Sequence, residues 1–213
     1  MKRSSRFERE LPAGYRRVFY LNAKSLKVGI VFNLLALPVF AAVFFLGILV
    51  FIRVYADKPF SMGNAFWGLL GFYVALLLYV VLHELVHGLF YKLLTGEKLV
   101  FGISWSCAFC GVPQIYTYRT VTILSAAAPL VLFTLLFLPL CAVLLFVEPY
   151  LYFLALALFG LHLGGCVGDF YLVMLLLLRY KAPNVLVRDT GPEQSVYVYD
   201  PQNDANTKKG DIL

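Results

Sequence analysis

Four long apolar runs, each of membrane-spanning length, limit what this chain can fold into more than any other feature. They cover approximately residues 28–53, 66–94, 121–147 and 150–178. A helix needs about 20 apolar residues to cross about 30 Å of hydrocarbon, and soluble domains are usually well below the 61% hydrophobic content of this chain. We therefore expect an all-α integral membrane protein with about four transmembrane helices. Its membrane domain, residues 28–180, lies between a basic segment, 1–27, and a polar tail, 181–213.

The basic residues predict the orientation of these helices. Of the 18 lysines and arginines, only Arg53 and Lys58 fall on the side of the membrane opposite the N-terminus. Cytoplasmic loops carry the excess of basic residues, so both termini and the loop 95–120 are expected in the cytoplasm of a multi-pass cell-membrane protein. The net charge of +6 follows from this topology and does not indicate nucleic acid as a partner. We expect the segment 1–27 to contact anionic lipid of the bilayer, and the oligomeric state is left open.

Few ionisable residues lie inside the expected spans, and they are the candidate functional residues. Of the 12 acidic residues only Glu84 and Asp169 are there, together with all three histidines, His83, His87 and His162. An ionisable group inside a membrane is costly and is a functional candidate by default. Since no lysine or arginine lies deep in a span, we expect a metal ion to supply the positive charge that the carboxylates need.

The spacing of three of these residues is that of a zinc hydrolase. His83 and His87 are four residues apart, so both imidazoles lie on one face of a helix. With Glu84 they form the H-E-x-x-H arrangement, in which the histidines bind zinc and the glutamate is the general base. Two imidazoles leave a tetrahedral zinc ion without its third protein ligand. The motif occurs by chance in soluble proteins, but histidine and glutamate are rare inside a span.

Asp169 is the expected third ligand, and His162 is the alternative. The second and fourth spans run in the same direction, and Asp169 lies about as far from its cytoplasmic end as His83 and His87 do. His162 is seven residues earlier, so a straight helix would not present both side chains to one ion. The glycines of "HLGGCVGDF", residues 162–170, could break that helix. His162 is therefore either the third ligand or a residue behind the ligands, and Asp169 could instead be a packing carboxylate.

Two short stretches resemble a known family. "HELVHG", residues 83–88, and "GCVGDF", residues 165–170, resemble the zincin peptidases related to the site-2 intramembrane metalloproteases. "LSAAAPLVLF", residues 124–133, is similar to the helix start that follows the membrane-edge hairpin of those proteases. The resemblance covers approximately residues 66–179 and implies a zinc-dependent peptidase that cuts membrane-protein or peptide substrates within the membrane. The chain departs from the site-2 proteases in having no Asn-Pro-type stretch before Asp169, which puts the substrate path in doubt.

The expected activity is peptide hydrolysis at a Zn²⁺ ion held by His83, His87 and Asp169. Water activated at the metal would attack the peptide bond, with Glu84 as the general base. One alternative is a catalytically silent zinc-binding membrane scaffold, which gives Glu84 no role. A less favoured alternative is a small proton-coupled transporter, since transporters of this kind usually contain repeats and none is visible in the sequence.

The expected cytoplasmic loop predicts a small β-hairpin at the membrane edge. Apolar residues alternate with small ones from Phe101 to Phe109, residues 111–113 have turn composition, and residues 115–118 follow as a return strand. The hairpin either adds an unwound substrate as another strand or anchors aromatic side chains among the lipid headgroups.

The cysteines and the tail suggest structural roles. Cys107 and Cys110 form a single C-x-x-C without two further ligands nearby, which is weak evidence for a metal site. Cys141 and Cys166 are expected to be small core residues. In the tail, residues 195–200 alternate as a strand does, and residues 201–213 have a disordered composition.

The orientation can be tested by labelling single cysteines in intact cells. We expect a membrane-impermeant thiol reagent to leave a cysteine at either terminus unlabelled and to label a cysteine placed in residues 57–63. The four native cysteines must first be replaced, and permeabilised cells serve as the control. Labelling of either terminus in intact cells would overturn the orientation.

Overall fold

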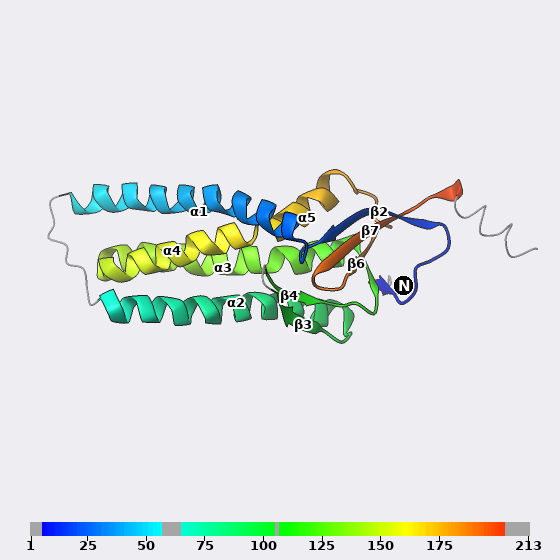
Figure 1. Ribbon diagram of the computed structural model, residues 1–213, viewed down its shortest axis with the longest axis horizontal. Helices are drawn as coiled ribbons and strands as arrows, with labels where there is room; N and C mark the ends of the chain where they lie inside the picture. The colour runs from blue at the N-terminus through cyan, green and yellow to red at the C-terminus, as the bar shows by residue number, and fades with distance from the viewer. Residues whose placement is uncertain (1–5, 57–64, 105–106, 203–213) are drawn as a thin grey trace, which may run out of the picture. The chain divides into compact units, whose positions relative to one another are not determined.

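The computed structural model describes residues 6–56, 65–104 and 107–202, which are mostly helical (Figure 1). The helices are α1 Leu26–Tyr55, α2 Ala65–Thr95, α3 Arg119–Val147, α4 Pro149–Gly165 and α5 Val167–Leu178. The strands are β1 Phe7–Glu8, β2 Tyr15–Asn22, β3 Val100–Ile103, β4 Ala108–Gly111, β5 Tyr116–Tyr118, β6 Leu186–Asp189 and β7 Glu193–Tyr199. The expected outer loop 57–63, Trp105 and most of the predicted disordered tail lie outside the described residues.

The expectation of several membrane-length apolar helices is confirmed. Helices α1, α2 and α3 are each long and apolar enough to cross a membrane, and α4 with α5 forms a fourth candidate span if the bent pair counts as one. This is consistent with a membrane location, while the direction of the spans stays a prediction. The fourth span is not straight, because α4 and α5 meet at a bend of 41°.

The bend follows from the glycines of residues 162–170. Helix α4 ends at Gly165, and Cys166 adopts φ −77° and ψ 0° before α5 begins. A Cβ at Gly164 would lie 3.0 Å from the main-chain oxygen of Ala36, so the glycine allows α4 to approach α1 closely. The break puts Asp169 in the first turn of α5, where the unpaired amide groups of a helix start favour a carboxylate.

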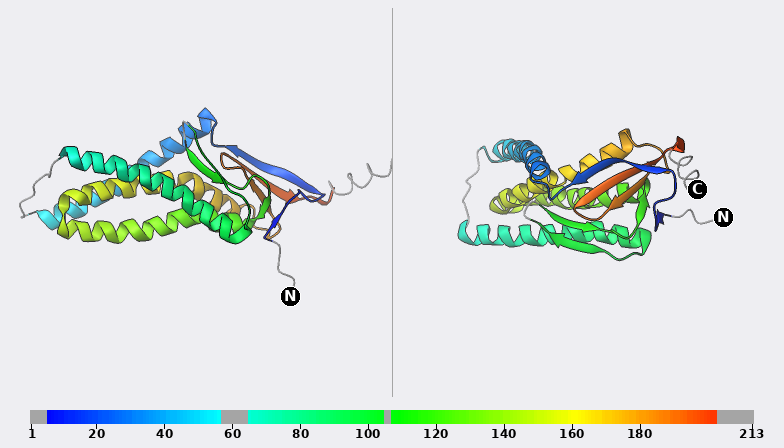
Figure 2. Two further views of the ribbon diagram at one scale, coloured as in Figure 1. Left: turned by 90° about the horizontal axis from the view of Figure 1, so that it is seen from below. Right: turned by 45° about the vertical axis from the view of Figure 1, so that its right-hand side comes forward.

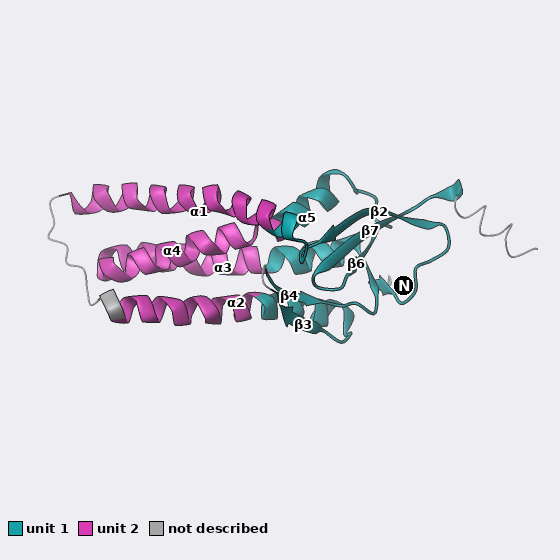
Figure 3. Cartoon of the chain, viewed as in Figure 1, with its two compact units in different colours: residues 1–29, 84–128, 170–213 teal, residues 30–83, 129–169 magenta. Residues whose placement is uncertain are grey.

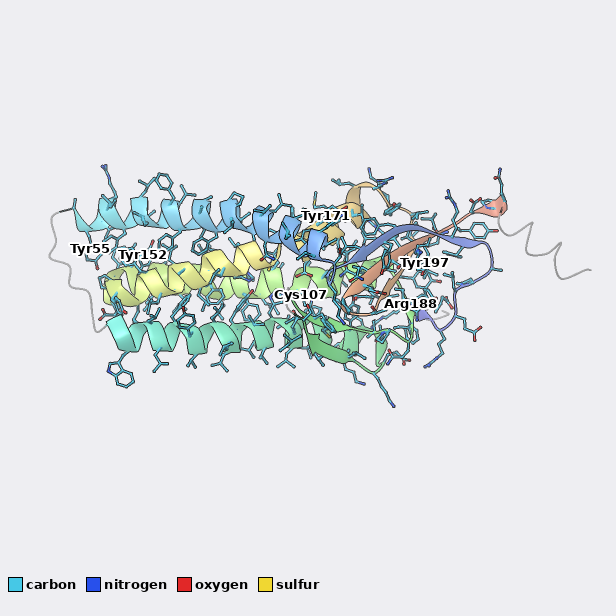
Figure 4. All side chains as sticks on the ribbon, in the orientation of Figure 1. Tyr55, Cys107, Tyr152, Tyr171, Arg188 and Tyr197 are labelled. Atoms are coloured by element: carbon cyan, nitrogen blue, oxygen red, sulfur yellow. The ribbon has the colours of Figure 1, made fainter. Side chains whose placement is uncertain are left out.

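The contacts divide the chain into two compact units, coloured separately in Figure 3. Unit 2, residues 30–83 and 129–169, is a helical bundle in which α4 contacts the other helices through ring packing. Phe153 of α4 packs on Phe51 of α1, and Phe159 of α4 packs on Phe137 of α3. Two tyrosines of this unit, labelled in Figure 4, donate hydrogen bonds of 2.8 Å to main-chain oxygens: Tyr55 to Leu145 and Tyr152 to Gly47. Such bonds satisfy hydroxyl groups that would otherwise be costly in hydrocarbon.

Unit 1, residues 1–29, 84–128 and 170–213, contains a five-stranded antiparallel sheet with the order β1-β5-β6-β7-β2. Figure 2 shows β2 (blue) beside β7 (orange), and their register joins Tyr15 to Tyr199 and Asn22 to Glu193. The sheet packs on α5 and the start of α3 through a buried apolar cluster: Ala126, Leu172, Leu176, Val185, Val187 and Val196.

This sheet corrects the expectation of an all-α protein with one small hairpin. Strand β2 lies in the segment predicted only to contact lipid, and β6 and β7 lie in the polar tail. The predicted tail strand, residues 195–200, corresponds to most of β7. Strand β2 pairs with β7 more than 170 residues away, and β6 pairs with β5 about 70 residues away. Because such distant pairing leaves no local pattern, the sequence can show a strand without showing the sheet.

The hairpin is present, but its predicted turn was wrong. Strands β3 and β4 pair from Val100↔Gly111 to Ile103↔Ala108, and the turn between them is closed by a 2.8 Å bond from Ser104 N to Cys107 O. The predicted return strand, residues 115–118, instead contributes β5 to the larger sheet. The physical reason is burial, because Val112 and Ile115 between the two sheets are fully buried in a cluster with Tyr91 and Val121.

Within unit 1, a buried carboxylate ties helix α2 to the sheet. The hydroxyl of Tyr91 on α2 donates a 2.7 Å hydrogen bond to Asp189 Oδ2, and both residues are buried. Asp189 Oδ1 accepts a 2.8 Å bond from the amide of Gly191. Asp189 also accepts, through its main-chain oxygen, a bond from the amide of Val112. The last turn of α2 is therefore held by the C-terminal strands.

We expect Asp189→Ala to destabilise the protein, because it leaves the buried Tyr91 hydroxyl and Gly191 amide without their acceptor. Such a loss typically costs about 1–3 kcal/mol, and it should lower the melting temperature in detergent. Asp200→Ala is the matched control, since Asp200 pairs with the exposed Arg16 side chain and accepts a hydrogen bond from the Gln202 amide at the surface, and exposed pairs contribute about 0–1 kcal/mol. Equal melting temperatures for the two variants would contradict the role of Asp189.

Candidate metal centre

His83, Glu84 and His87 lie within five residues of α2, so that the two histidines are one helical turn apart, as the spacing predicts. Both histidines are 8% exposed and Glu84 is half-buried. One ligand atom from each of the three lies within 4.8 Å of the others. Since all three belong to one continuous helix, their mutual placement is set by helix geometry.

The two nitrogens of His83 face different groups. Its Nδ1 lies 3.0 Å from the hydroxyl oxygen of Tyr79, one turn earlier on α2. Its Nε2 lies 3.4 Å from Asp169 Oδ2, in the first turn of α5. Asp169 therefore lies beside His83, which agrees with their expected similar distance from the helix ends. The other expected ligand, His87, lies one turn after His83 on α2.

The hydrogen bond of His87 fixes which of its nitrogens can bind a metal. His87 Nδ1 lies 2.8 Å from the main-chain oxygen of Ser125 on α3. A carbonyl oxygen only accepts hydrogen bonds, so Nδ1 carries the proton and Nε2 keeps its lone pair. Metal-binding histidines usually have their second nitrogen held in this way.

Pro129 explains why the Ser125 carbonyl is available. In a helix this oxygen would accept the amide hydrogen of the residue four positions later. That residue is Pro129, which lies inside α3 and has no amide hydrogen. The four-residue spacing from Ser125 to Pro129 is the sequence signal that could have predicted the His87 partner.

His162 lies behind Tyr79 and is fully buried. Its Nδ1 is 2.9 Å from the Tyr79 hydroxyl, and its Nε2 is 3.2 Å from Thr134 Oγ1. Cys166 Sγ is 3.6 Å from the same Nδ1. The contacts of Tyr79, Thr134 and Cys166 with the histidines were not predicted, because a single tyrosine, threonine or cysteine in an apolar run has no spacing that indicates such a contact.

A second group of possible ligands therefore overlaps the first. His83, His162 and Cys166 are all buried, and one ligand atom of each lies within 4.8 Å of the others. The two groups share His83, so the position of a metal depends on which nitrogen of the His83 ring binds it. The structure thus keeps His162 open as the alternative ligand and adds Cys166 to it.

The loop cysteines are not members of either group among the described residues. Cys107 Sγ lies 3.3 Å from Ser104 Oγ in the turn between β3 and β4. Burial, together with the negative charges of Glu84 and Asp189, raises the pKa of the Cys110 thiol to about 12. Cys110 is therefore a neutral thiol at physiological pH, whereas a metal ligand must be a thiolate.

The distance between His83 Nε2 and Asp169 Oδ2 shows whether these two atoms could bind the same zinc ion. Tetrahedral ligands with bonds of about 2.0–2.1 Å are separated by about 3.3 Å. The 3.4 Å between His83 Nε2 and Asp169 Oδ2 is close to that value and is long for a direct N–H···O hydrogen bond, which is usually 2.7–3.2 Å. The nitrogen and carboxylate donors also suit zinc, so the residues present fit the metal.

Comparison with known proteins gave one match. A family model described as "Putative zincin peptidase" matches residues 76–184, a region that contains the described H-E-x-x-H turn and Asp169. No curated protein matches the chain, and no solved structure matches it.

Metal analysis of purified variants can assign the third ligand. We expect about one zinc ion per wild-type chain. Asp169→Ala should lose zinc nearly as completely as His87→Ala, because each removes one of three protein ligands. His162→Asn should still bind about one zinc ion per chain at saturating zinc. If His162→Asn and Cys166→Ser lose the metal while Asp169→Ala keeps it, the ligands are His83, His162 and Cys166 instead.

Proposed function

The chain belongs to the family described as "Putative zincin peptidase", whose model matches just over half of it, and on that premise we propose that it is a zinc-dependent intramembrane peptidase. Membership suggests a zinc metallopeptidase. The proposal goes further in placing the hydrolysis of membrane-protein or peptide substrates within the bilayer. It is supported by the location of the H-E-x-x-H turn on α2, one of the helices that could span a membrane.

One observation carries the proposal, namely that both histidines of the motif have Nδ1 against an oxygen partner. His83 Nδ1 faces the Tyr79 hydroxyl, and His87 Nδ1 faces the Ser125 carbonyl. The same arrangement is typical of metal-binding histidines.

His83, His87 and Asp169 are the residues that would hold the metal. The two histidines would use Nε2, and Asp169 would contribute a carboxylate oxygen and one negative charge. That charge offsets part of the charge of a divalent ion and so lowers the cost of placing it among apolar helices. When bound, zinc supplies a Lewis acid that polarises the scissile carbonyl and lowers the pKa of water.

Glu84 is the proposed general base. It follows His83 directly, so it lies beside the ligands on the same turn of α2, and it is half-buried. Its carboxylate would accept a proton from the attacking water and return it to the leaving amine, so that no net proton is consumed when the peptide bond breaks. Its negative charge also reaches Cys110 on β4, which places the carboxylate near the β3–β4 hairpin within unit 1.

The position of the β3–β4 hairpin favours substrate binding beside the H-E-x-x-H turn of α2. A Cβ at Gly88, the residue after His87, would lie 2.8 Å from Phe101 Cζ and 3.2 Å from Cys110 Sγ. The hairpin therefore packs directly on α2 at the end of the motif. Strand β3 has β4 as its partner in a two-stranded sheet, and its Ile103 side chain is 84% exposed.

An extended substrate could pair with the outer edge of β3 through main-chain hydrogen bonds. This mode suits the chemistry, because a peptide bond inside an intact helix is shielded and must be unwound before water can attack it. The other role expected for the hairpin, anchoring apolar side chains among lipid headgroups, is compatible with the same exposure. We propose that the partners of the protein are the lipid bilayer and a membrane-protein or peptide substrate. We also propose that both termini are cytoplasmic.

Glu84→Gln separates an enzyme from a silent scaffold. The substitution keeps the size of the side chain but removes the proton acceptor, and loss of a general base typically lowers the rate about 10²–10⁴-fold. We expect the variant to fold and to bind zinc as the wild type does, while a co-expressed single-span membrane substrate accumulates uncut. Cleavage is followed by gel mobility of the tagged substrate.

His87→Ala is the matched control, because it should lose both zinc and cleavage. Wild-type rates in Glu84→Gln would show that Glu84 is not the base. A wild-type protein that binds zinc but cuts no member of a library of single-span substrates would favour the scaffold over the peptidase.

A further inference from the structure

Four polar side chains in unit 2 form one continuous chain of contacts behind His83. The hydroxyl of Tyr79 lies between two imidazoles, 3.0 Å from His83 Nδ1 and 2.9 Å from His162 Nδ1. The other nitrogen of His162 lies 3.2 Å from Thr134 Oγ1. Tyr79 and His162 are buried, and buried polar groups are usually hydrogen-bonded, so these contacts help to satisfy side chains that water does not reach.

Counting protons along this chain leaves two possible directions. A tyrosine hydroxyl has one hydrogen, and a neutral imidazole has one N–H and one acceptor nitrogen. In one direction His83 Nδ1–H donates to Tyr79, the Tyr79 O–H donates to His162 Nδ1, and His162 Nε2–H donates to Thr134. In the reverse direction every proton moves to the other end of its bond, and His83 Nε2–H then donates to Asp169.

The distance at the end of the chain distinguishes the two directions. The reverse direction requires an N–H···O bond between His83 Nε2 and Asp169 Oδ2, but their separation of 3.4 Å is longer than the usual 2.7–3.2 Å. The first direction leaves a lone pair on His83 Nε2, next to a carboxylate oxygen at the spacing of two zinc ligands. The geometry therefore fits the first direction, in which the hydrogen bonds are donated from His83 toward Thr134, away from the metal position.

We propose that Tyr79 and His162 are positioning residues, which hold His83 in the Nδ1–H tautomer, so that the lone pair of Nε2 can bind zinc. This inference rests on the proposed function for the presence of zinc, and it assigns to His162 the place behind the ligands. Cys166 fits the same assignment, since its thiol, 3.6 Å from His162 Nδ1, is a second, weak donor to the nitrogen that accepts from Tyr79.

Aromatic packing holds this chain in place. The Tyr79 ring makes edge contacts with Phe133 and lies near Phe137, at centroid distances of 5.2 and 5.8 Å. The His162 ring is stacked on Phe159 at 6.3 Å. Hydrogen bonds in such apolar surroundings are stronger than in water, and an unpaired polar group there is costly. The His83 ring is thus oriented by a partner that is itself fixed.

Zinc affinity, measured by competition with a chelator, tests the proposal without any substrate. Partners behind metal ligands typically change metal affinity about 10–100-fold, and we expect that loss in Tyr79→Phe. His162→Leu should cause a similar loss, and the double variant should be little worse than either single one, because both act through one chain. His162→Asn should retain most of the affinity, since its side-chain oxygen can accept the Tyr79 hydrogen.

Tyr152→Phe is the matched control. It removes a buried tyrosine hydroxyl of the same unit, which donates to the Gly47 main-chain oxygen, and we expect its zinc affinity to equal that of the wild type. A general effect of removing a hydroxyl from the bundle would therefore appear in both tyrosine variants, whereas a positioning role appears only in Tyr79→Phe.

Nitrogen NMR of the histidines gives a direct signature. The chain has three histidines, so selective ¹⁵N labelling with one variant for each gives their assignment. In zinc-loaded protein we expect His83 to be protonated at Nδ1 and His162 at Nε2. Protonation of His162 at Nδ1, or a Tyr79→Phe affinity equal to the wild type, would overturn the proposal.

The remaining outcomes separate this inference from the peptidase itself. If the wild type binds zinc with the expected order of affinities but cuts no substrate, the peptidase proposal fails and the positioning role is supported. If the wild type binds no zinc, or if His162→Leu abolishes binding even at saturating zinc as His87→Ala does, the positioning role is wrong.

Discussion

A histidine that binds metal among apolar helices must keep one nitrogen free and give the other a partner, and the candidate site depends on this requirement. For His87 the partner is the Ser125 carbonyl, which Pro129 leaves without an intrahelical donor. For His83 the partner is the Tyr79 hydroxyl. The two solutions differ in kind. A carbonyl can only accept and fixes the tautomer alone, whereas a hydroxyl fixes it only when a further group, His162, receives its proton.

The rest of the described structure holds the motif-bearing helix in register with these partners. In unit 1 the hairpin packs on α2 at Gly88, and the Tyr91–Asp189 bond holds the last turn of the helix to the sheet. In unit 2 the break before α5 turns Asp169 toward His83. Each candidate ligand therefore has a contact outside its own turn, as a preformed metal site requires.

Local patterns were enough to predict the membrane-length helices, the H-E-x-x-H turn and the proximity of Asp169 to His83, because each depends on spacing within a helix or on depth along it. The partners behind the ligands could not be predicted in this way. Whether the Tyr79 hydroxyl meets His162 depends on how two helices are rotated against each other, and no spacing within either run records that rotation. The sheet was missed for a similar reason, since β2 finds its partner, β7, at the other end of the chain.

The pairing of β2 with β7 also sets an order for biogenesis. Tyr15 is joined to Tyr199 and Asn22 to Glu193, so strand β2 must wait for nearly the whole chain to be synthesised before it can pair. All the candidate spans lie between these strands, and they would enter the bilayer before the sheet closes. Four of the five strands of that sheet, β1, β2, β6 and β7, lie outside the family-matched region 76–184. Most of the sheet is therefore built from strands that the family model does not cover, and β2 can pair only after β7 has been made.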